Sequence, residues 1–164
     1  GGNGTIEDFS VLPRLYRDAI VVESWEGTHN TLVAQVLRDF SERGLHQPWL
    51  GQIRAEIDLL DKPQLANIAE IARSELNAVE NRISMLLSEE PRAAAAQIRH
   101  VVNHMCRLTD WVALATQLQW EMTWGVEADT ADALELYRLT KFERADPQSA
   151  PELVDLQRRF SETI

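Results

Sequence analysis

A short stretch near the start of the chain, WEGTHN at 25–30, combines side chains that acid–base chemistry needs. Glu26 places a carboxylate between a tryptophan and a glycine, and Thr28 adds a hydroxyl two residues later. We expect a helix to begin at about Thr28, and the free N–H groups at a helix N-terminus bind carbonyl or phosphate oxygens. Glu26 is therefore a candidate functional carboxylate, the alternative being an ordinary surface acid ahead of an amphipathic helix.

Two histidines and a group of tryptophans are further candidates. His100 and His104 have the i, i+4 spacing that places two imidazoles on one helix face, but no third ligand lies within a turn. We therefore expect no metal, and favour two histidines at a helix seam or at the surface. Three tryptophans and a methionine on the same helix suit either a ligand cage or, as we favour, aromatic packing against a neighbouring helix or subunit: Trp111, Trp120, Trp124 and Met122.

The charge of the chain limits its partners. Its 164 residues carry 16 Lys and Arg against 26 Asp and Glu, a net charge of −10. Such a field repels phosphate backbones and anionic lipid surfaces, so nucleic-acid and membrane binding are not expected. The single Cys106, expected to be a buried small hydrophobe, excludes an internal disulfide and indicates a cytoplasmic protein.

Helical periodicity recurs along the whole chain, whereas strand-like alternation is nearly absent. We therefore predict an all-α fold, a helical bundle of about six or seven helices joined by short turns. The expected helices cover 11–19, 28–43, 48–61, 61–89, 91–124, 129–142 and 151 to the C-terminus. Two of them carry clear apolar stripes: Trp49, Ile53, Ile57 and Leu60 in one, and Leu65, Ile68, Ala72, Leu76, Val79, Ile83 and Leu86 in the next.

Several boundaries follow from local signals. Gly44 is expected to end the second helix as a C′ glycine, and Gly125 to end the long fifth one. Asp61 is expected to cap the helix that carries Pro63 in its first turn. Residues 20–25 are expected to form a loop, and residues 45–48 a linker.

The first 44 residues also contain a set of motifs in a defined order. GGNG stands at 1–4, Arg17-Asp18-Ala19 follows an acidic residue and a proline, and WEGTHN begins after six further residues. This order resembles the C-terminal region of the acyl-CoA dehydrogenase family. The 120 residues that follow resemble the added helical unit of its longer members, and the motifs look closest to the alkylation-response branch. The resemblance implies that 1–44 ends the catalytic helical domain and that 45–164 is an additional C-terminal helical domain.

The resemblance also implies roles for the residues around Glu26. In the family, the matching glutamate removes the α-proton of an acyl-CoA thioester while a β-hydride moves to the flavin of FAD. Glu26 is then the base, its backbone N–H holds the thioester carbonyl, and Trp25 is an apolar wall that, with Gly27, lines the substrate site.

The resemblance also implies which residues contact the cofactor. Gly1 and Gly2 match positions that touch the flavin nucleotide, often from a neighbouring subunit, while Thr28, His29 and Asn30 match flavin contacts after the base. Further implied partners are an electron acceptor and further copies of the chain, as a dimer or tetramer.

We therefore expect the chain to be the C-terminal portion of a longer FAD-dependent enzyme and to be inactive by itself. It lacks the middle β-domain and the N-terminal helices that the family uses to hold FAD. The alternative is a non-catalytic helical module for interaction or oligomerisation in an alkylation-response-type homologue, with DNA binding disfavoured by the acidic charge.

Overall fold

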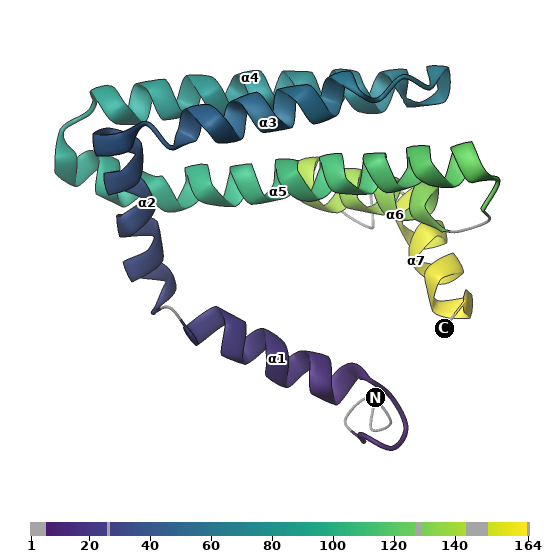
Figure 1. Cartoon of the computed structure of the whole chain (residues 1–164). Coiled ribbons are helices and arrows are strands. Elements are labelled where there is room, and N and C mark those ends of the chain that lie inside the picture. Colours follow the sequence, from purple (N-terminus) through teal and green to yellow (C-terminus); the bar gives the residue numbers. More distant parts are fainter. Residues whose placement is uncertain (1–5, 26, 127–128, 144–150, 164) are drawn as a thin grey trace. The chain divides into compact units, whose positions relative to one another are not determined.

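The computed structural model describes residues 6–25, 27–126, 129–143 and 151–163. Within these residues every regular element is helical, and no strand is present, which confirms the predicted all-α class with six or seven helices (Figure 1). In chain order the elements are α1 (Leu12–Trp25), α2 (His29–Arg43), α3 (His46–Asp58), a 3₁₀ turn (Pro63–Leu65), α4 (Ala66–Ser88), α5 (Pro91–Trp124), α6 (Thr130–Tyr137), a π-helical turn (Arg138–Phe142) and α7 (Pro151–Thr163).

The chain forms two compact units. Unit 1 consists of Gly1–Leu45 together with Leu86–His100, and unit 2 consists of His46–Met85 together with Val101–Ile164. The long helices α4 and α5 therefore contribute residues to both units. The first segment of unit 1 ends at Leu45, one residue after Gly44. The second segment contains the turn between α4 and α5, which lies much later in the sequence.

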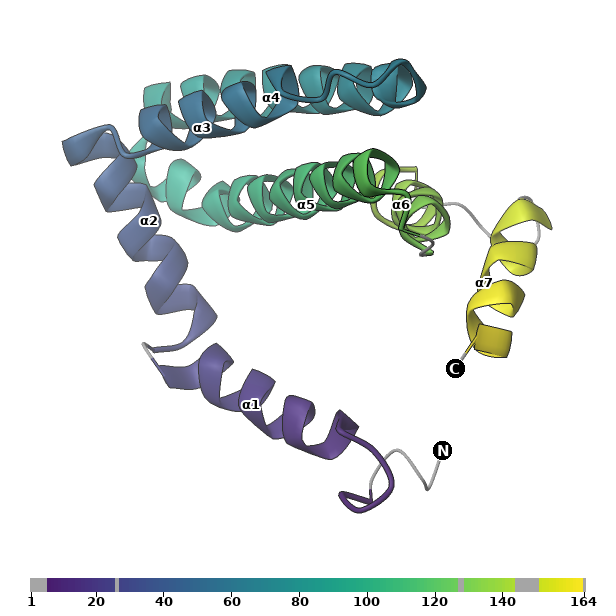
Figure 2. The ribbon, with the colours of Figure 1, turned by 45° about the vertical axis from the view of Figure 1, so that its right-hand side comes forward.

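Unit 2 is held together by the apolar faces of α3, α4 and α5. The helices α3 and α4 run side by side in opposite directions in both ribbon views (Figures 1 and 2). The predicted stripes are confirmed, because all their members in this unit are buried except the half-buried Trp49 and Ile68. The facing stripe of α5 consists of Val101, Leu108, Trp111, Val112, Ala115 and Leu118. Each buried side chain of this size stabilises the fold by roughly 1.5–3 kcal/mol.

Polar contacts fix how these helices align. Arg54 Nη2 of α3 donates to Glu80 Oε2 of α4 at 3.0 Å, and the Trp49 indole N–H donates to Thr109 Oγ1 of α5 at 3.3 Å. Gln119 of α5 binds the turn after α3 twice, donating to the Leu59 carbonyl at 2.7 Å and accepting from the Asp61 N–H at 2.9 Å. These hydrogen bonds lie at the rim of the apolar stripes. They therefore contribute more to the alignment of the helices than to the free energy of unfolding.

Two expectations about helix ends near the start of the chain are wrong. Residues 20–25 belong to α1 rather than to a loop. The β-branched residues at 20–22 lower helix propensity by only about 0.7 kcal/mol each or less, and no Gly or Pro interrupts the helix there. Residues 46–48 are the first turn of α3 rather than a linker, because Pro48 is tolerated where a backbone N–H has no helical partner.

Asp61 does not cap α4 as expected. The turn that precedes α4 begins after Lys62, which makes no side-chain capping bond, and Asp61 instead gives its backbone N–H to Gln119. The predicted ends at Gly44 and Gly125 and the starts at Pro91 and Pro151 are confirmed. Within the described residues, no helix is long and apolar enough to cross a membrane.

Replacing Gly44 with alanine should lower the free energy of unfolding by about 1 kcal/mol. Gly44 has φ +64°, a left-handed conformation that costs a residue with a Cβ about 1–2 kcal/mol, and no atom lies within 4 Å of an added Cβ. The matched control is Gly51→Ala in the interior of α3, also with open space around the Cβ, which should stabilise by about 0.5–1 kcal/mol. Urea unfolding of both variants checks the opposite signs, and equal signs would contradict the assignment of Gly44 as the helix terminator.

Candidate functional site

The start of α2 carries the described part of the WEGTHN stretch. Gly27 has φ +125°, a backbone conformation that residues with a side chain rarely adopt. Thr28 is extended (φ −69°, ψ 155°) and its Oγ1 accepts a hydrogen bond from the Thr31 N–H at 3.4 Å, as an N-cap residue does. The chain therefore turns sharply at Gly27 and enters the helix at once.

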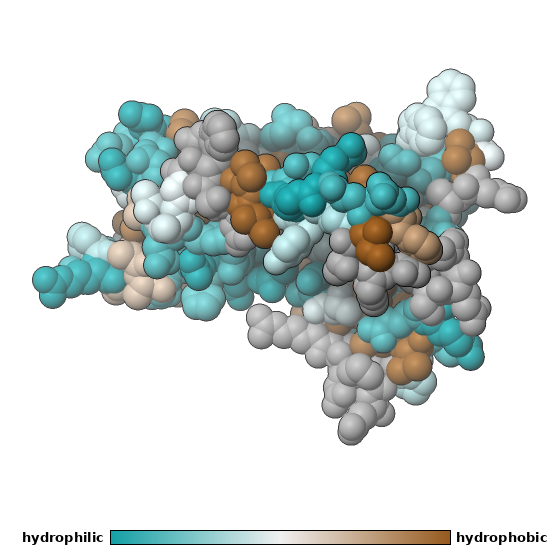
Figure 3. Space-filling view, turned by 90° about the horizontal axis from the view of Figure 1, so that it is seen from below, coloured by the Kyte–Doolittle hydropathy of each residue, from teal (hydrophilic) through white to brown (hydrophobic). Residues whose placement is uncertain are grey.

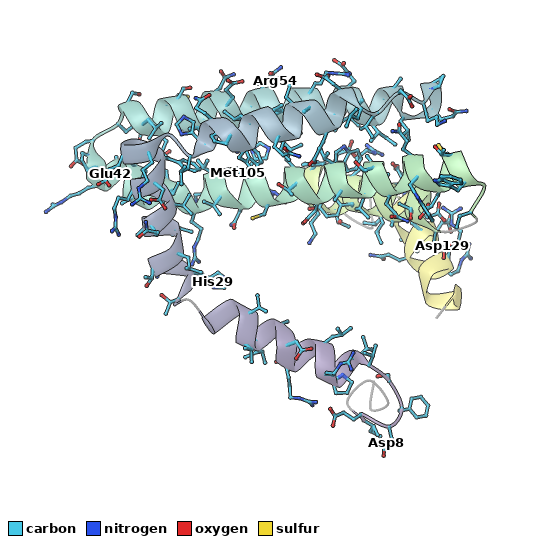
Figure 4. The ribbon with its side chains drawn as sticks, viewed as in Figure 1. Asp8, His29, Glu42, Arg54, Met105 and Asp129 are labelled. Carbon is cyan, nitrogen blue, oxygen red and sulfur yellow. The ribbon has the colours of Figure 1, made fainter. Side chains whose placement is uncertain are left out.

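Several of the predicted site residues fall where the structure gives no account. Gly1, Gly2 and Glu26 lie outside the described residues, and so does the side chain of Trp25, whose backbone ends α1. The three predicted cofactor contacts Thr28, His29 and Asn30 are all exposed at the beginning of α2 (Figure 4 shows His29). The structure therefore brings these three together on one helix turn.

Arg99 joins this helix turn from a distant part of the sequence. Its Nη2 donates to Oδ1 of Asn30 at 2.9 Å, across 69 residues, and both residues belong to unit 1. Sequence reasoning missed Arg99, because nothing in the local sequence of α5 distinguishes it from other surface arginines. The first turn of α2 has no acidic side chain.

This donor set suits a ligand rich in oxygen acceptors. A hydroxyl, an amide, a guanidinium and the free N–H groups of a helix start are the groups that bind phosphate or carbonyl oxygens. Thr28, His29, Asn30 and Arg99 are the described residues that offer these groups.

A second polar cluster lies within unit 2 around one buried histidine. The imidazole of His104 is only 4% exposed, its Nε2 lies 2.5 Å from Glu75 Oε2, and its Nδ1 lies 3.2 Å from Arg82 Nη1. An arginine can only donate, so Nδ1 accepts and carries no proton, while Nε2–H donates to Glu75. The geometry therefore defines a neutral histidine.

The pKa of His104 is lowered from its ordinary value of 6.5. Burial is the main cause, since it disfavours the charged imidazolium; the Glu75 carboxylate opposes it, and the guanidinium groups of Arg82 and Arg107 add to it. His100, four residues earlier, is exposed. Because His104 is bound to α4, the two histidines do not form a shared ligand pair, and the described residues contain no group of three or more His, Cys, Asp or Glu that would hold a metal.

The tryptophans separate into a buried one and two exposed ones. Trp111 is 1% exposed, donates from its indole N–H to the Ile68 carbonyl at 3.2 Å, and packs edge-on to Phe142 with ring centroids 5.4 Å apart. The predicted aromatic packing is therefore confirmed for Trp111. Trp120 and Trp124 are 50% and 71% exposed.

Two further groups differ from what the sequence indicates. Cys106 is exposed, so the expectation of a buried thiol is wrong; partial desolvation and the nearby Asp110 carboxylate raise its pKa, which disfavours the reactive thiolate. Glu121 is a buried carboxylate that sequence reasoning missed. Its Oε1 accepts from Gln117 Nε2 at 2.8 Å and from Thr130 Oγ1 at 2.6 Å, which ties α5 to the start of α6.

A surface hollow of about 480 Å³ lies in unit 2 beside Leu59 and Trp120. Its polar side chains are engaged elsewhere, since Gln119 binds the α3–α4 turn and Thr116 donates to the Val112 carbonyl. Among the described residues that line it, Glu56 is the one ionisable side chain.

Comparison with known proteins adds no relative: no protein-family model matches the chain, and neither a curated protein nor a solved structure matches it.

The neutral state of His104 predicts a specific pH dependence of stability. Because the folded-state pKa lies below 6.5, the unfolded chain takes up more protons as the pH falls through about 6.5, and the folded state loses stability. His104→Gln, which keeps a donor for Glu75, should lose less free energy of unfolding between pH 7.5 and 5.5 than the wild type. Urea unfolding at both pH values measures this difference.

The control for this prediction is His100→Gln, the same change at an exposed position of the same helix. It should keep the wild-type pH dependence. If His104→Gln also kept it, the assignment of a neutral, buried His104 would be contradicted.

Proposed function

We propose that the chain is the C-terminal portion of an FAD-dependent flavoprotein of the acyl-CoA dehydrogenase type, closest to the alkylation-response branch. Its reaction is the α,β-dehydrogenation of an acyl-CoA thioester, with Glu26 as the base. The observation that supports it most is the start of α2: directly after Glu26 the chain turns at Gly27, with φ +125°, and Thr28 caps the helix. The free N–H groups of a helix start bind carbonyl oxygens, as the proposed reaction requires.

The roles of the residues follow from the chemistry of the reaction. Glu26 takes the α-proton of the thioester, and its backbone N–H holds the thioester carbonyl, which stabilises the negative charge that develops there. Trp25 and Gly27 complete the substrate contacts, Trp25 as an apolar wall that raises the basicity of the carboxylate by excluding water. FAD, when bound, supplies the acceptor for the β-hydride.

The cofactor contacts in this proposal are Gly1, Gly2, Thr28, His29 and Asn30. Arg99 extends them, because its bond to Asn30 Oδ1 orients the amide and adds a positive charge at the start of α2. An electron acceptor reoxidises the flavin, and the protein works in the cytoplasm as a homo-oligomer, a dimer or tetramer.

The 164-residue chain by itself should not retain FAD. In the family that the motifs resemble, the middle β-domain and the N-terminal helices hold most of the cofactor. The purified chain, incubated with FAD and desalted, should show no flavin absorbance. A yellow chain with one FAD per molecule would contradict the proposal that regions outside these 164 residues hold most of the cofactor.

Replacing Glu26 with glutamine in the longer flavoprotein should abolish reduction of the flavin by acyl-CoA while FAD stays bound. Loss of a general base lowers the rate by about 10²–10⁴-fold, and glutamine keeps the shape of the side chain. Anaerobic bleaching of the flavin by acyl-CoA measures the rate, and the flavin absorbance before substrate is added measures occupancy.

The control is Glu42→Gln, the same change at an exposed position near the other end of α2 (Figure 4). Bleaching at the wild-type rate is expected. If the Glu26→Gln variant still bleached at the wild-type rate, the assignment of Glu26 as the base would be wrong.

A second function, a non-catalytic module for helical interaction or oligomerisation, is favoured by a different observation. Nine of the eighteen large hydrophobic residues that are exposed in the described part of the chain lie between Ile6 and Val22 (Figure 3 shows hydrophobic side chains on one face of the molecule). Surfaces of this kind mark contacts with other proteins. DNA is disfavoured as a partner by the net charge of −10, and a gel-shift assay at low salt should show no binding.

A further inference from the structure

The surface hollow beside Leu59 and Trp120 is a place where unit 2 could bind another molecule. Its volume of about 480 Å³ falls in the range of about 300–1,000 Å³ that ligand pockets occupy. The end of α3 and the turn after it form one wall, and α5 forms the other. The lining residues are Glu56, Leu59 and Leu60 on the first wall and Ala113, Thr116, Gln117, Gln119 and Trp120 on the second.

The charge of this hollow is negative, because its one ionisable side chain is the half-buried Glu56. Glu56 Oε1 accepts a hydrogen bond from Gln52 Nε2 at 2.7 Å, and no described residue donates to Oε2. The neighbouring Arg54 does not neutralise Glu56, since its guanidinium binds Glu80 of α4. The carboxylate therefore has an oxygen available to a cation that enters the hollow.

The uncharged polar side chains of the hollow already donate to the protein. Thr116 Oγ1 donates to the Val112 carbonyl at 2.9 Å, and Gln117 Nε2 donates to Glu121 Oε1 at 2.8 Å. Gln119 uses both ends of its amide on the turn after α3. Thr116 Oγ1 and the carbonyl oxygen of Gln117 can still accept, so a ligand that brings its own donors suits this lining.

The apolar part of the lining favours a flat cation on an aliphatic stem. Trp120 is 50% exposed and Leu59 is 71% exposed. The face of an indole ring attracts cations, and a guanidinium both stacks on such a ring and matches the geometry of a carboxylate. Aliphatic stems pack along apolar side chains such as Leu59 while the charged head stays in a polar setting.

We propose that this hollow binds an arginine side chain of a basic partner protein, with the guanidinium between the Glu56 carboxylate and the Trp120 ring. The net charge of −10 attracts a basic partner. Sites for free small molecules bury about 70–90% of the ligand surface, whereas Leu59 and Trp120 stay half exposed or more. An arginine fixed to a partner has the rest of its surface covered by that partner.

This inference is independent of the flavoenzyme, and it uses a different surface from the exposed hydrophobic side chains between Ile6 and Val22. Its failure would leave both proposed functions as they are.

The test follows the indole N–H signal of Trp120 in ¹H–¹⁵N NMR spectra of the 164-residue chain. The chain has five tryptophans, and Trp120→Phe identifies the signal by its loss. The probe is a tripeptide with arginine between two alanines and with both ends blocked. It should move the Trp120 signal with a Kd on the order of 1 mM, since one side chain in an open hollow buries little surface.

Three analogues test the chemistry of the ligand. The citrulline tripeptide, a neutral mimic of arginine, should bind at least about tenfold more weakly, and the lysine tripeptide about threefold more weakly, because an ammonium is compact and strongly hydrated. Methylguanidinium, the head group without a chain, should also bind at least about tenfold more weakly.

Two variants test the residues. Glu56→Gln, which keeps an oxygen for Gln52, should raise the Kd of the arginine tripeptide about fivefold. Trp120→Leu should raise it about threefold, measured from the backbone N–H signal of Thr116. The control is Glu70→Gln, the same change at an exposed position of α4 outside the hollow, which should leave the Kd unchanged. Circular dichroism should show the wild-type helix content in all three.

Each contrary outcome overturns a defined part of the proposal. If the arginine tripeptide leaves the Trp120 signal in place, or if Glu56→Gln binds as the wild type does, the hollow is not an arginine site. Equal binding of the citrulline or lysine tripeptide would rule out recognition of a guanidinium. Equal binding of methylguanidinium would assign the hollow to a small molecule. A Trp120 signal that moves when the chain alone is diluted would assign it to a second copy.

Discussion

Burial of one face of the 34-residue helix α5 is the constraint on which much of the described structure depends. In unit 2 its apolar stripe packs with those of α3 and α4, and Leu108, Val112 and Ala115 are completely buried there. A helix that is held along one face has a fixed rotation about its axis, so its remaining side chains point in set directions. Within unit 2, His104 and Gln119 reach their partners because this rotation is set.

The polar groups next to that face are tolerated because they are paired. The neutral imidazole of His104 donates from one ring nitrogen to Glu75 and accepts at the other from Arg82. Neither nitrogen is therefore left without a hydrogen bond. Tyr137 is similarly engaged: its hydroxyl donates to Asp110 Oδ2 at 3.0 Å, and burial is the main reason that its pKa is raised. Such networks fix the alignment of helices while they add little net stability.

The two proposed functions draw on different parts of the first 45 residues. The dehydrogenase proposal uses the turn at Gly27 and the start of α2, where donors and a guanidinium gather and acidic groups are absent from the first helical turn. The association proposal uses the exposed hydrophobic side chains between Ile6 and Val22.

The sequence by itself determined the helical class, the apolar stripes and the helix ends at Gly44, Pro91, Gly125 and Pro151. These features are local: a 3.6-residue period, a left-handed glycine or a missing N–H acts within a few residues. It also placed Thr28 at the start of α2. Its errors at 20–25 and 46–48 came from treating weak propensities as helix terminators, whereas in the described residues of this region the positive-φ positions are Gly27 and Gly44.

Only the tertiary structure decided which distant residues meet. Arg99 reaches Asn30 across 69 residues, and Glu75 reaches His104 across 29, because packing sets the rotation of their helices. The same packing buries Trp111 and leaves Trp120 exposed, although both are tryptophans on one apolar helix. No local signal carries this information, since the free energy that selects a partner comes from burying surface between segments far apart in the chain.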